Sequence, residues 1–349
     1  MISKYKYIAI ACIIASSVSF SHAQDMTYGD IKKAIESSHS LRKELLDHST
    51  GHAFLTLQNE KLAPEEKEKM MQQIGTSFKG KLRPYSGHGE WSVDWYNKGT
   101  TKRYDMQSDN SSDKNSDNFA GSFNRRVVAT PENAIYYNVK SKEAYINKPP
   151  QLAINAAALI RNFDLDRLYN PSVRGSFPDY LSNLETQDLT RTVETEVVNS
   201  KECLKIEFRS NRKEVDPKLG WIPRNLVQFW VCPEMSYSLV KYRNQHNSFL
   251  RLSEDKLVLW ESYDAEYEES KEHPGVWILK SMSRYEGSIM SKGILTCEFK
   301  DVKVGVDLPQ EMFTFDGLGV LPGTKVYDMT KDNKEPPFYY YKALQKQSD

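Results

Sequence analysis

Few side chains in this sequence have the types and spacing that chemistry requires, and two pairs come first. His48 and His52 stand four residues apart, the spacing of two metal ligands on one helical face. A helix predicted over this region ends at Gly51 and supplies no third ligand, which favours a solvated helix end. Glu194 and Glu196 alternate on a predicted strand. A carboxylate pair of this kind suits glycoside hydrolysis, but exposed acidic alternation is its ordinary interpretation.

Metal-binding and enzymatic motifs give little more. Residues 108–118 are rich in Asp, Asn and Ser, which predicts a solvated loop. Within it, Asp113 and Asp117 imitate calcium ligands of an EF-hand, but Asn118 replaces the required Gly and Asn124 the required Glu. The chain contains no nucleophile elbow, phosphate-binding loop, dinucleotide glycine motif or Cys-x-x-Cys motif. We therefore expect a non-enzymatic protein with no metal and no cofactor.

The cysteines allow one internal bridge. Beyond the first 23 residues they are Cys203, Cys232 and Cys297, an odd number. If the predicted strands 203–209 and 226–232 pair as a hairpin, Cys203 lies directly opposite Cys232. The sequence leaves a disulfide and two buried reduced thiols equally open, with Cys297 as the free thiol if the bridge forms.

Composition and the N-terminus limit the compartment and the partners. The 349 residues carry 47 basic and 47 acidic side chains, which lack the basic excess that nucleic-acid binding needs. Residues 1–23 have a basic start, a short apolar run and the ending Ser21-His22-Ala23, a pattern typical of a cleaved secretory signal. Its removal takes two lysines and leaves a net charge of −2. We expect an exported protein of the periplasm or cell envelope, with no transmembrane span in the mature chain.

Hydrophobic periodicity predicts one long helix and then mainly strands. Residues 27–47 follow the helical period, and residues 63–75 and 152–168 indicate further helices, with a shorter one near Tyr180 and Leu184. From residue 86 on, period-two alternation dominates. The sequence predicts an α+β fold: a curved antiparallel sheet, an incomplete β-barrel of about 10–11 strands, with helices on its concave side. A single domain over 24–330 would carry insertions near 58–75 and 108–122, and 331–349 would be a C-terminal tail.

Aromatic residues on the predicted strands are the strongest functional signal. The chain has 20 Tyr, 14 Phe and 6 Trp, and large rings on strands either fill a core or line a groove. For any single ring, the core is the commoner place. The groove candidates are Trp91, Trp95, Tyr104, Trp230, Trp260 and Trp277.

Several of these strands resemble a known family. Gly87–Trp95 followed by Lys102–Asp105 looks like the early strand pair of the LolA/LolB-like periplasmic lipoprotein carriers. Phe229–Lys241 resembles a later hairpin of that family, and Pro274–Lys280 and Leu308–Phe315 also fit such exported proteins. The resemblance implies an incomplete antiparallel barrel whose concave face, under helices, binds acyl chains. It also implies that Arg103 lies near the cavity, because it matches an arginine of the returning strand.

Three functions follow from these observations. The first is an envelope protein that binds a lipid, a lipoprotein acyl chain or another hydrophobic ligand in a groove. The second is a regulatory module that uses the same fold to hold an envelope protein partner. The third is a secreted carbohydrate-binding protein whose rings stack on sugars. The fold alone does not choose among them.

Overall fold

The computed structural model describes residues 26–61, 88–108, 123–148, 176–211, 224–247, 257–287, 291–330 and 337–342. The expected signal peptide, the helices expected at 63–75 and 152–168 and most of the loop at 108–118 lie outside the described residues. The chain divides into two compact units. Unit 1 comprises residues 1–42, 56–88 and 166–298, and unit 2 comprises residues 43–55, 89–165 and 299–349.

Strands dominate the described residues. The helices among them are α2 (Tyr28–Leu46), α6 (Phe177–Glu185) and the short 3-10 helices η3 (Pro233–Met235) and η4 (Gln310–Phe313). The strands are β1 (His48–Lys61), β2 (His88–Lys98), β3 (Thr101–Ser108), β4 (Phe123–Ala129), β5 (Ala134–Asn138), β6 (Glu143–Asn147), β7 (Leu189–Val198), β8 (Lys201–Ser210), β9 (Asn225–Cys232), β10 (Ser238–His246), β11 (Val258–Glu269), β12 (Trp277–Gly287), β13 (Ser291–Val304), β14 (Lys325–Asp328) and β15 (Phe338–Tyr340).

The strands follow one hydrogen-bonded order, β15-β14-β6-β5-β4-β3-β2-β1-β13-β12-β11-β10-β9-β8-β7. Neighbours are antiparallel from β2 to β6 and from β7 to β13, whereas β14 pairs in parallel with β6. The two end strands stay unpaired with each other, so the sheet is open. This confirms the predicted α+β class with an open antiparallel sheet. Among the described residues it has 15 strands rather than 10–11, and β15 lies within the expected tail.

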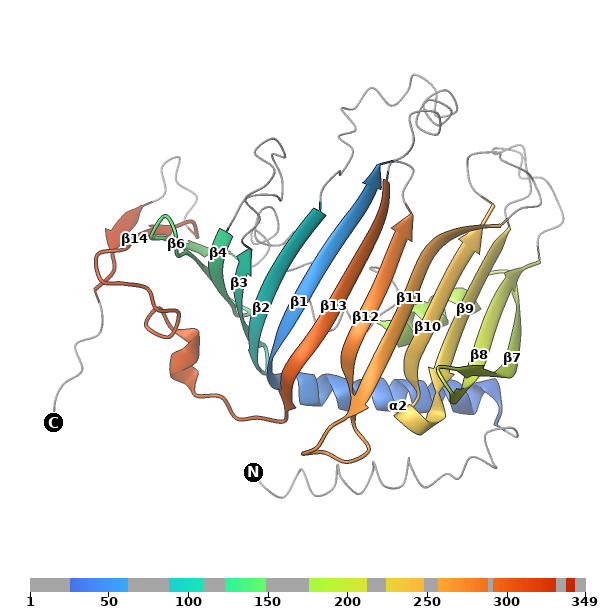
Figure 1. The fold of residues 1–349 in the computed structure, drawn as a ribbon. Helices are drawn as coiled ribbons and strands as arrows, with labels where there is room; N and C mark the ends of the chain where they lie inside the picture. Colours follow the sequence, from blue (N-terminus) through green and yellow to red (C-terminus); the bar gives the residue numbers. More distant parts are fainter. Residues whose placement is uncertain are drawn as a thin grey trace. The chain divides into compact units, whose positions relative to one another are not determined.

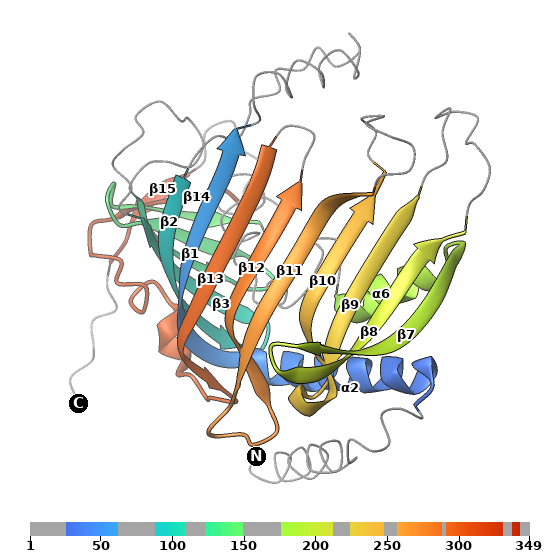
Figure 2. The same ribbon diagram turned by 45° about the vertical axis from the view of Figure 1, so that its right-hand side comes forward.

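In unit 1, α2 and α6 pack on the same face of the strands (Figures 1 and 2). Thr27 and Asp30 start α2 with a reciprocal capping box, in which the Asp30 N–H donates to Thr27 Oγ1 and the Thr27 N–H to the Asp30 carboxylate. Phe177 of α6 contacts Phe229 of β9 with ring centroids 5.2 Å apart. Lys32 donates to Glu185 at 2.6 Å and ties the two helices together. The expected helices at 27–47 and near Tyr180 are confirmed.

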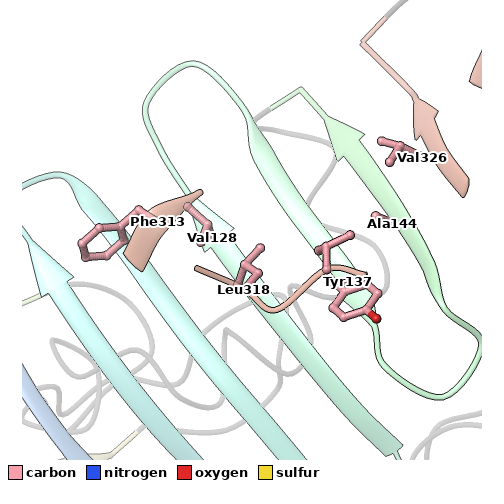
Figure 3. Packing of buried hydrophobic residues seen from close by; sticks show 7 residues of the cluster. Val128, Tyr137, Ala144, Phe313, Leu318 and Val326 are labelled. Atoms are coloured by element: carbon pink, nitrogen blue, oxygen red, sulfur yellow. The ribbon is translucent and has the colours of Figure 1, made fainter. Parts of the chain in front are cut away.

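In unit 2, a core forms between one face of the strands and the segment 309–320, which we call the covering segment. Figure 3 shows the side chains of this cluster, drawn from β4, β5, β6, β14 and the covering segment. They are Val128, Tyr137, Ala144, Phe313, Leu318, Val320 and Val326. The covering segment follows β13 in the chain and leads to β14, the parallel partner of β6.

Gly51 has a different role from the one expected. The helix ends earlier, at Leu46, and Gly51 lies inside β1. A Cβ placed on Gly51 would come within 2.5 Å of the Trp95 ring, so the glycine provides room for that ring. Gly51 is therefore required for packing against Trp95 and does not end the helix.

Candidate ligand-binding face

A row of aromatic side chains crosses unit 2, each lying directly opposite the next in the strand register. Val127 of β4 occupies the one position within the row that is not aromatic. The row, which we call the aromatic row, consists of Trp95 (β2), Tyr104 (β3), Tyr136 (β5), Tyr145 (β6), Tyr327 (β14) and Phe338 (β15).

Strand geometry places the whole row on one face. Residues directly opposite each other on paired strands share a face, and successive residues of a strand alternate between faces. Neighbouring strands lie about 4.8 Å apart, so the three steps from Tyr136 to Phe338 cover about 14 Å. The row therefore forms a continuous apolar surface perpendicular to the strands.

Exposure rises along the row. Trp95 and Tyr104 are 0% and 2% exposed, Tyr136, Tyr145 and Tyr327 are partly exposed, and Phe338 is 51% exposed. The inner end is thus core and the outer end is surface. A contiguous exposed apolar surface of this kind commonly marks a site of interaction.

The inner end is anchored by packing and one hydrogen bond. The Trp95 ring meets Phe299 edge to face at 5.9 Å, and its Nε1–H donates to Ser49 Oγ at 3.3 Å. Asn97, two residues further along β2, donates to the carbonyl of Leu46 at the end of α2. These contacts hold the inner rings in one position.

The outer rings contact each other and a lysine. Tyr145 and Tyr327 are stacked, with centroids 5.1 Å apart and planes 11° apart, and Tyr327 lies 6.1 Å from Phe338. Lys325 Nζ lies 4.6 Å from the Tyr327 centroid and 4.0 Å from that of Phe338. Tyr136 lies 5.9 Å from Tyr145. The four rings therefore form a connected surface rather than separate exposed residues.

The hydroxyl of Tyr145 stays protonated. Burial, together with a hydrogen bond to the Glu143 carboxylate at 3.1 Å, raises the pKa of Tyr145 to about 12. Burial also raises the pKa of Tyr136. Near neutral pH both groups are therefore protonated phenols rather than phenolate nucleophiles.

A row of polar side chains runs beside the outer half of the aromatic row. Arg125 is opposite Asn138, Asn138 opposite Glu143, and Glu143 opposite Lys325. Arg125 also lies 5.8 Å from the Tyr136 ring. We call these four residues the polar row. An apolar row and a polar row therefore lie side by side on the same face of the sheet, which makes this surface amphipathic.

The structure places three sequence candidates on this face and one on the other. Trp91, Trp95 and Tyr104 share the face of the aromatic row, and the Trp91 Nε1 atom is buried without a hydrogen-bond partner. Arg103, next to Tyr104, faces the opposite side because neighbouring strand residues alternate. There its guanidinium donates to the carbonyls of Met312 and Gly317 in the covering segment.

The other three tryptophans lie in unit 1. Trp230 is 4% exposed and lies under two lysines, with Lys241 Nζ 4.6 Å and Lys205 Nζ 5.9 Å from its ring. Its neighbour Phe229 faces the helices, so Trp230 faces away from them. Trp260 contacts the His246 ring at 4.7 Å, and Trp277 begins β12 opposite Glu269. The structure does not bring these three rings together with the aromatic row.

The histidine and glutamate pairs singled out in the sequence form contacts with other side chains. His48 begins β1, and His52 Nδ1 lies 2.6 Å from Asp94 Oδ1, so the two histidines share no helical face. Glu194 and Glu196 both approach Lys205, at 3.9 and 3.7 Å. Within the described ranges, no group of three or more His, Cys, Asp or Glu residues gathers as metal ligands would. Neither described α-helix has both the length and the apolar character that a membrane crossing needs.

Comparisons with known proteins give a distant likeness. No family model and no curated protein matches the chain. One similar solved structure is described as an outer membrane lipoprotein-sorting protein domain from Vibrio parahaemolyticus. It is 11% identical, with 81% of this chain and 96% of that chain covered and a TM-score of 0.35. Another is a DUF1329 family protein from Desulfovibrio piger ATCC 29098, 10% identical, with coverage of 82% and 98% and a TM-score of 0.36.

Most of the aromatic row was missed at the sequence level. Tyr136 and Tyr145 lie on five-residue strands. The tryptophans on other predicted strands were the stronger indication of a groove, so these two tyrosines were not chosen as candidates. Tyr327 and Phe338 lie on strands of four and three residues near the C-terminus. Only the pairing of β14 with β6 shows that these rings continue one row.

Proposed function

We propose that the protein is a non-enzymatic envelope protein that binds a lipid or another hydrophobic ligand on the aromatic row. The observation that carries this proposal is the in-register row itself, which leads from a buried core to the 51% exposed ring of Phe338. Burying such rings against an apolar ligand is favourable, because each large side chain removes considerable apolar area from water.

The polar row supports an amphiphilic ligand. The apolar chain would lie along Tyr136, Tyr145, Tyr327 and Phe338, and the polar group would lie beside the charges of the polar row. Lys325 belongs to both surfaces, because its Nζ lies over two rings while its backbone is opposite Glu143. Ligand sites typically combine such an apolar lining with a few polar groups.

Titration with a dansyl-labelled fatty acid, with unlabelled fatty acid as competitor, tests the proposal. The variant Phe338→Ser, alone and with Tyr327→Ser, should weaken binding, by about tenfold for the double variant. Tyr339→Ser is the matched control, because Tyr339 is 45% exposed on the same strand but faces the other side. Absence of saturable binding by the unmodified protein would refute the proposal. An equal loss in Tyr339→Ser would refute the assignment to the row.

A further inference from the structure

Two buried cysteines face each other across a strand pair of unit 1. In the β8–β9 ladder Leu204 is opposite Val231 and Arg209 is opposite Leu226. Continued by one step, this register places Cys203 opposite Cys232, and the side chains of the two residues are joined by a hydrogen bond. Directly opposite residues of antiparallel strands have Cα atoms about 4.5–5.5 Å apart, within the range of about 4.4–6.8 Å that a disulfide spans. The backbone is therefore already in place for a bond between these two sulfurs.

The two sulfurs interact, and they are not equivalent. Both cysteines are 0% exposed, and both are free thiols in the structure. The hydrogen bond between their sulfurs raises the pKa of Cys203 and lowers that of Cys232. Cys232 also accepts hydrogen bonds from the backbone of Met235 and Glu234, which lower its pKa further. Cys203 therefore holds its proton, and Cys232 has the greater thiolate character.

Cys297, by contrast, is paired with Met282 in the register of β12 and β13. It is 1% exposed, and burial raises its pKa. A buried cysteine with a raised pKa is a poor nucleophile and a poor partner for exchange.

We propose that Cys203 and Cys232 form a cross-strand disulfide when the protein folds in the presence of a disulfide oxidant. The thiolate of either cysteine attacks one sulfur of the oxidant and releases the first thiol, leaving a mixed disulfide on that cysteine. The other cysteine then loses its proton and attacks the sulfur of the first, which releases the second thiol. Two protein thiols are oxidised and one oxidant disulfide is reduced to two thiols. Because both sulfurs are buried in the folded protein, the exchange takes place before β8 and β9 close over them.

The bond would link the two ends of the hairpin formed by β8 and β9. Closing a loop in the unfolded chain lowers its conformational entropy and so favours the folded state. The disulfide is a proposal separate from that of ligand binding: both cysteines lie in unit 1, whereas the aromatic row lies in unit 2.

Differential alkylation of each cysteine tests the proposal. The full chain is unfolded and refolded with a mixture of reduced and oxidised glutathione, then denatured and alkylated before and after reduction with two different reagents. Peptide mass spectrometry should show Cys203 and Cys232 labelled only after reduction and Cys297 labelled before it. Cys203→Ser should leave Cys232 open to the first reagent, whereas Cys297→Ser should leave the pair protected. Full labelling of Cys203 and Cys232 before reduction, or a linkage that includes Cys297, would overturn the proposal.

Thermal unfolding supplies a second measurement. The oxidised protein should unfold about 5 °C or more above the Cys203→Ser, Cys232→Ser double variant, a shift typical of one disulfide. Reduction should remove this difference in the unmodified protein and leave the double variant unchanged. Equal midpoints for the oxidised protein and the double variant would contradict a stabilising bond.

Discussion

Arg103 and Tyr104 are neighbours in sequence but serve opposite faces of β3. Tyr104 belongs to the aromatic row, while Arg103 is 7% exposed on the other side and forms an ion pair with Asp105 at 2.5 Å. Its guanidinium also donates to the carbonyls of Met312 and Gly317 at 2.8 and 2.7 Å. The residue therefore fastens the covering segment to the sheet rather than contacting a ligand on the row.

Replacing Arg103 by Gln should lower the free energy of unfolding by about 3 kcal/mol, because it leaves Asp105 and two carbonyls without their donor in a largely buried place. Urea unfolding measures the change. Lys303→Gln, at an exposed position, is the control and should change stability by less than about 0.5 kcal/mol. A loss of fatty-acid binding in Arg103→Gln without a loss of stability would instead place Arg103 in the ligand site.

Single residues were predictable where a local pattern decides the contact. The opposition of Cys203 and Cys232 follows from two hairpin strands, and the register of β8 and β9, which pairs Leu204 with Val231, leads to the same pair when it is continued by one step. The alternation that buries Trp95 could also be read from its strand. The partners of Tyr145 could not, because Tyr327 reaches it through a parallel pairing that no local pattern encodes.

At the scale of elements, the packing of β1 against β2 leaves no room for a side chain at Gly51. The Trp95 ring occupies the space where a side chain of residue 51 would lie, so the close packing of β1 against this ring requires glycine at that position. Gly29, near the start of α2, has only Thr27 Oγ1 near its missing side chain, at 3.6 Å.

Gly51→Ala should destabilise the protein by about 2 kcal/mol, because the added methyl group must displace the Trp95 ring. Near-ultraviolet circular dichroism should show the altered tryptophan environment, and urea unfolding should give the energy. Gly29→Ala is the matched substitution. It should raise stability by about 0.5 kcal/mol, since alanine favours a helix more than glycine does. A neutral Gly51→Ala would contradict the close packing of the ring.

Long elements were easier to predict than short ones. Strands of eight or more residues and the 19-residue helix α2 carry enough repeats for their period to be read. β14 and β15, with four and three residues, carry too few, so residues 331–349 were expected to be only a tail. The predicted number of strands was low for the same reason.

At the scale of the whole molecule, the expected export signal would place the protein in the cell envelope, the compartment that the proposed function requires. A cysteine pair that can form a disulfide suits an oxidising envelope compartment. Expression of the full chain in a Gram-negative host, followed by mass measurement of the envelope fraction, should give a protein that begins at Gln24. Substitution of Ala23 by a large residue should block this cleavage. Retention of Met1 in the envelope fraction, or recovery only from the cytoplasm, would contradict the predicted signal.

The parallel pairing of β14 with β6 also sets an order of events. β6 lies in the first half of the sequence, whereas its outer neighbours β14 and β15 follow β13 and the covering segment in the sequence. Contacts between distant parts of a chain form slowly, because a long loop must close first. Until then the sheet of unit 2 stops at Tyr145, and half of the exposed rings are missing. The surface proposed to hold the ligand would therefore be complete only after the covering segment is in place.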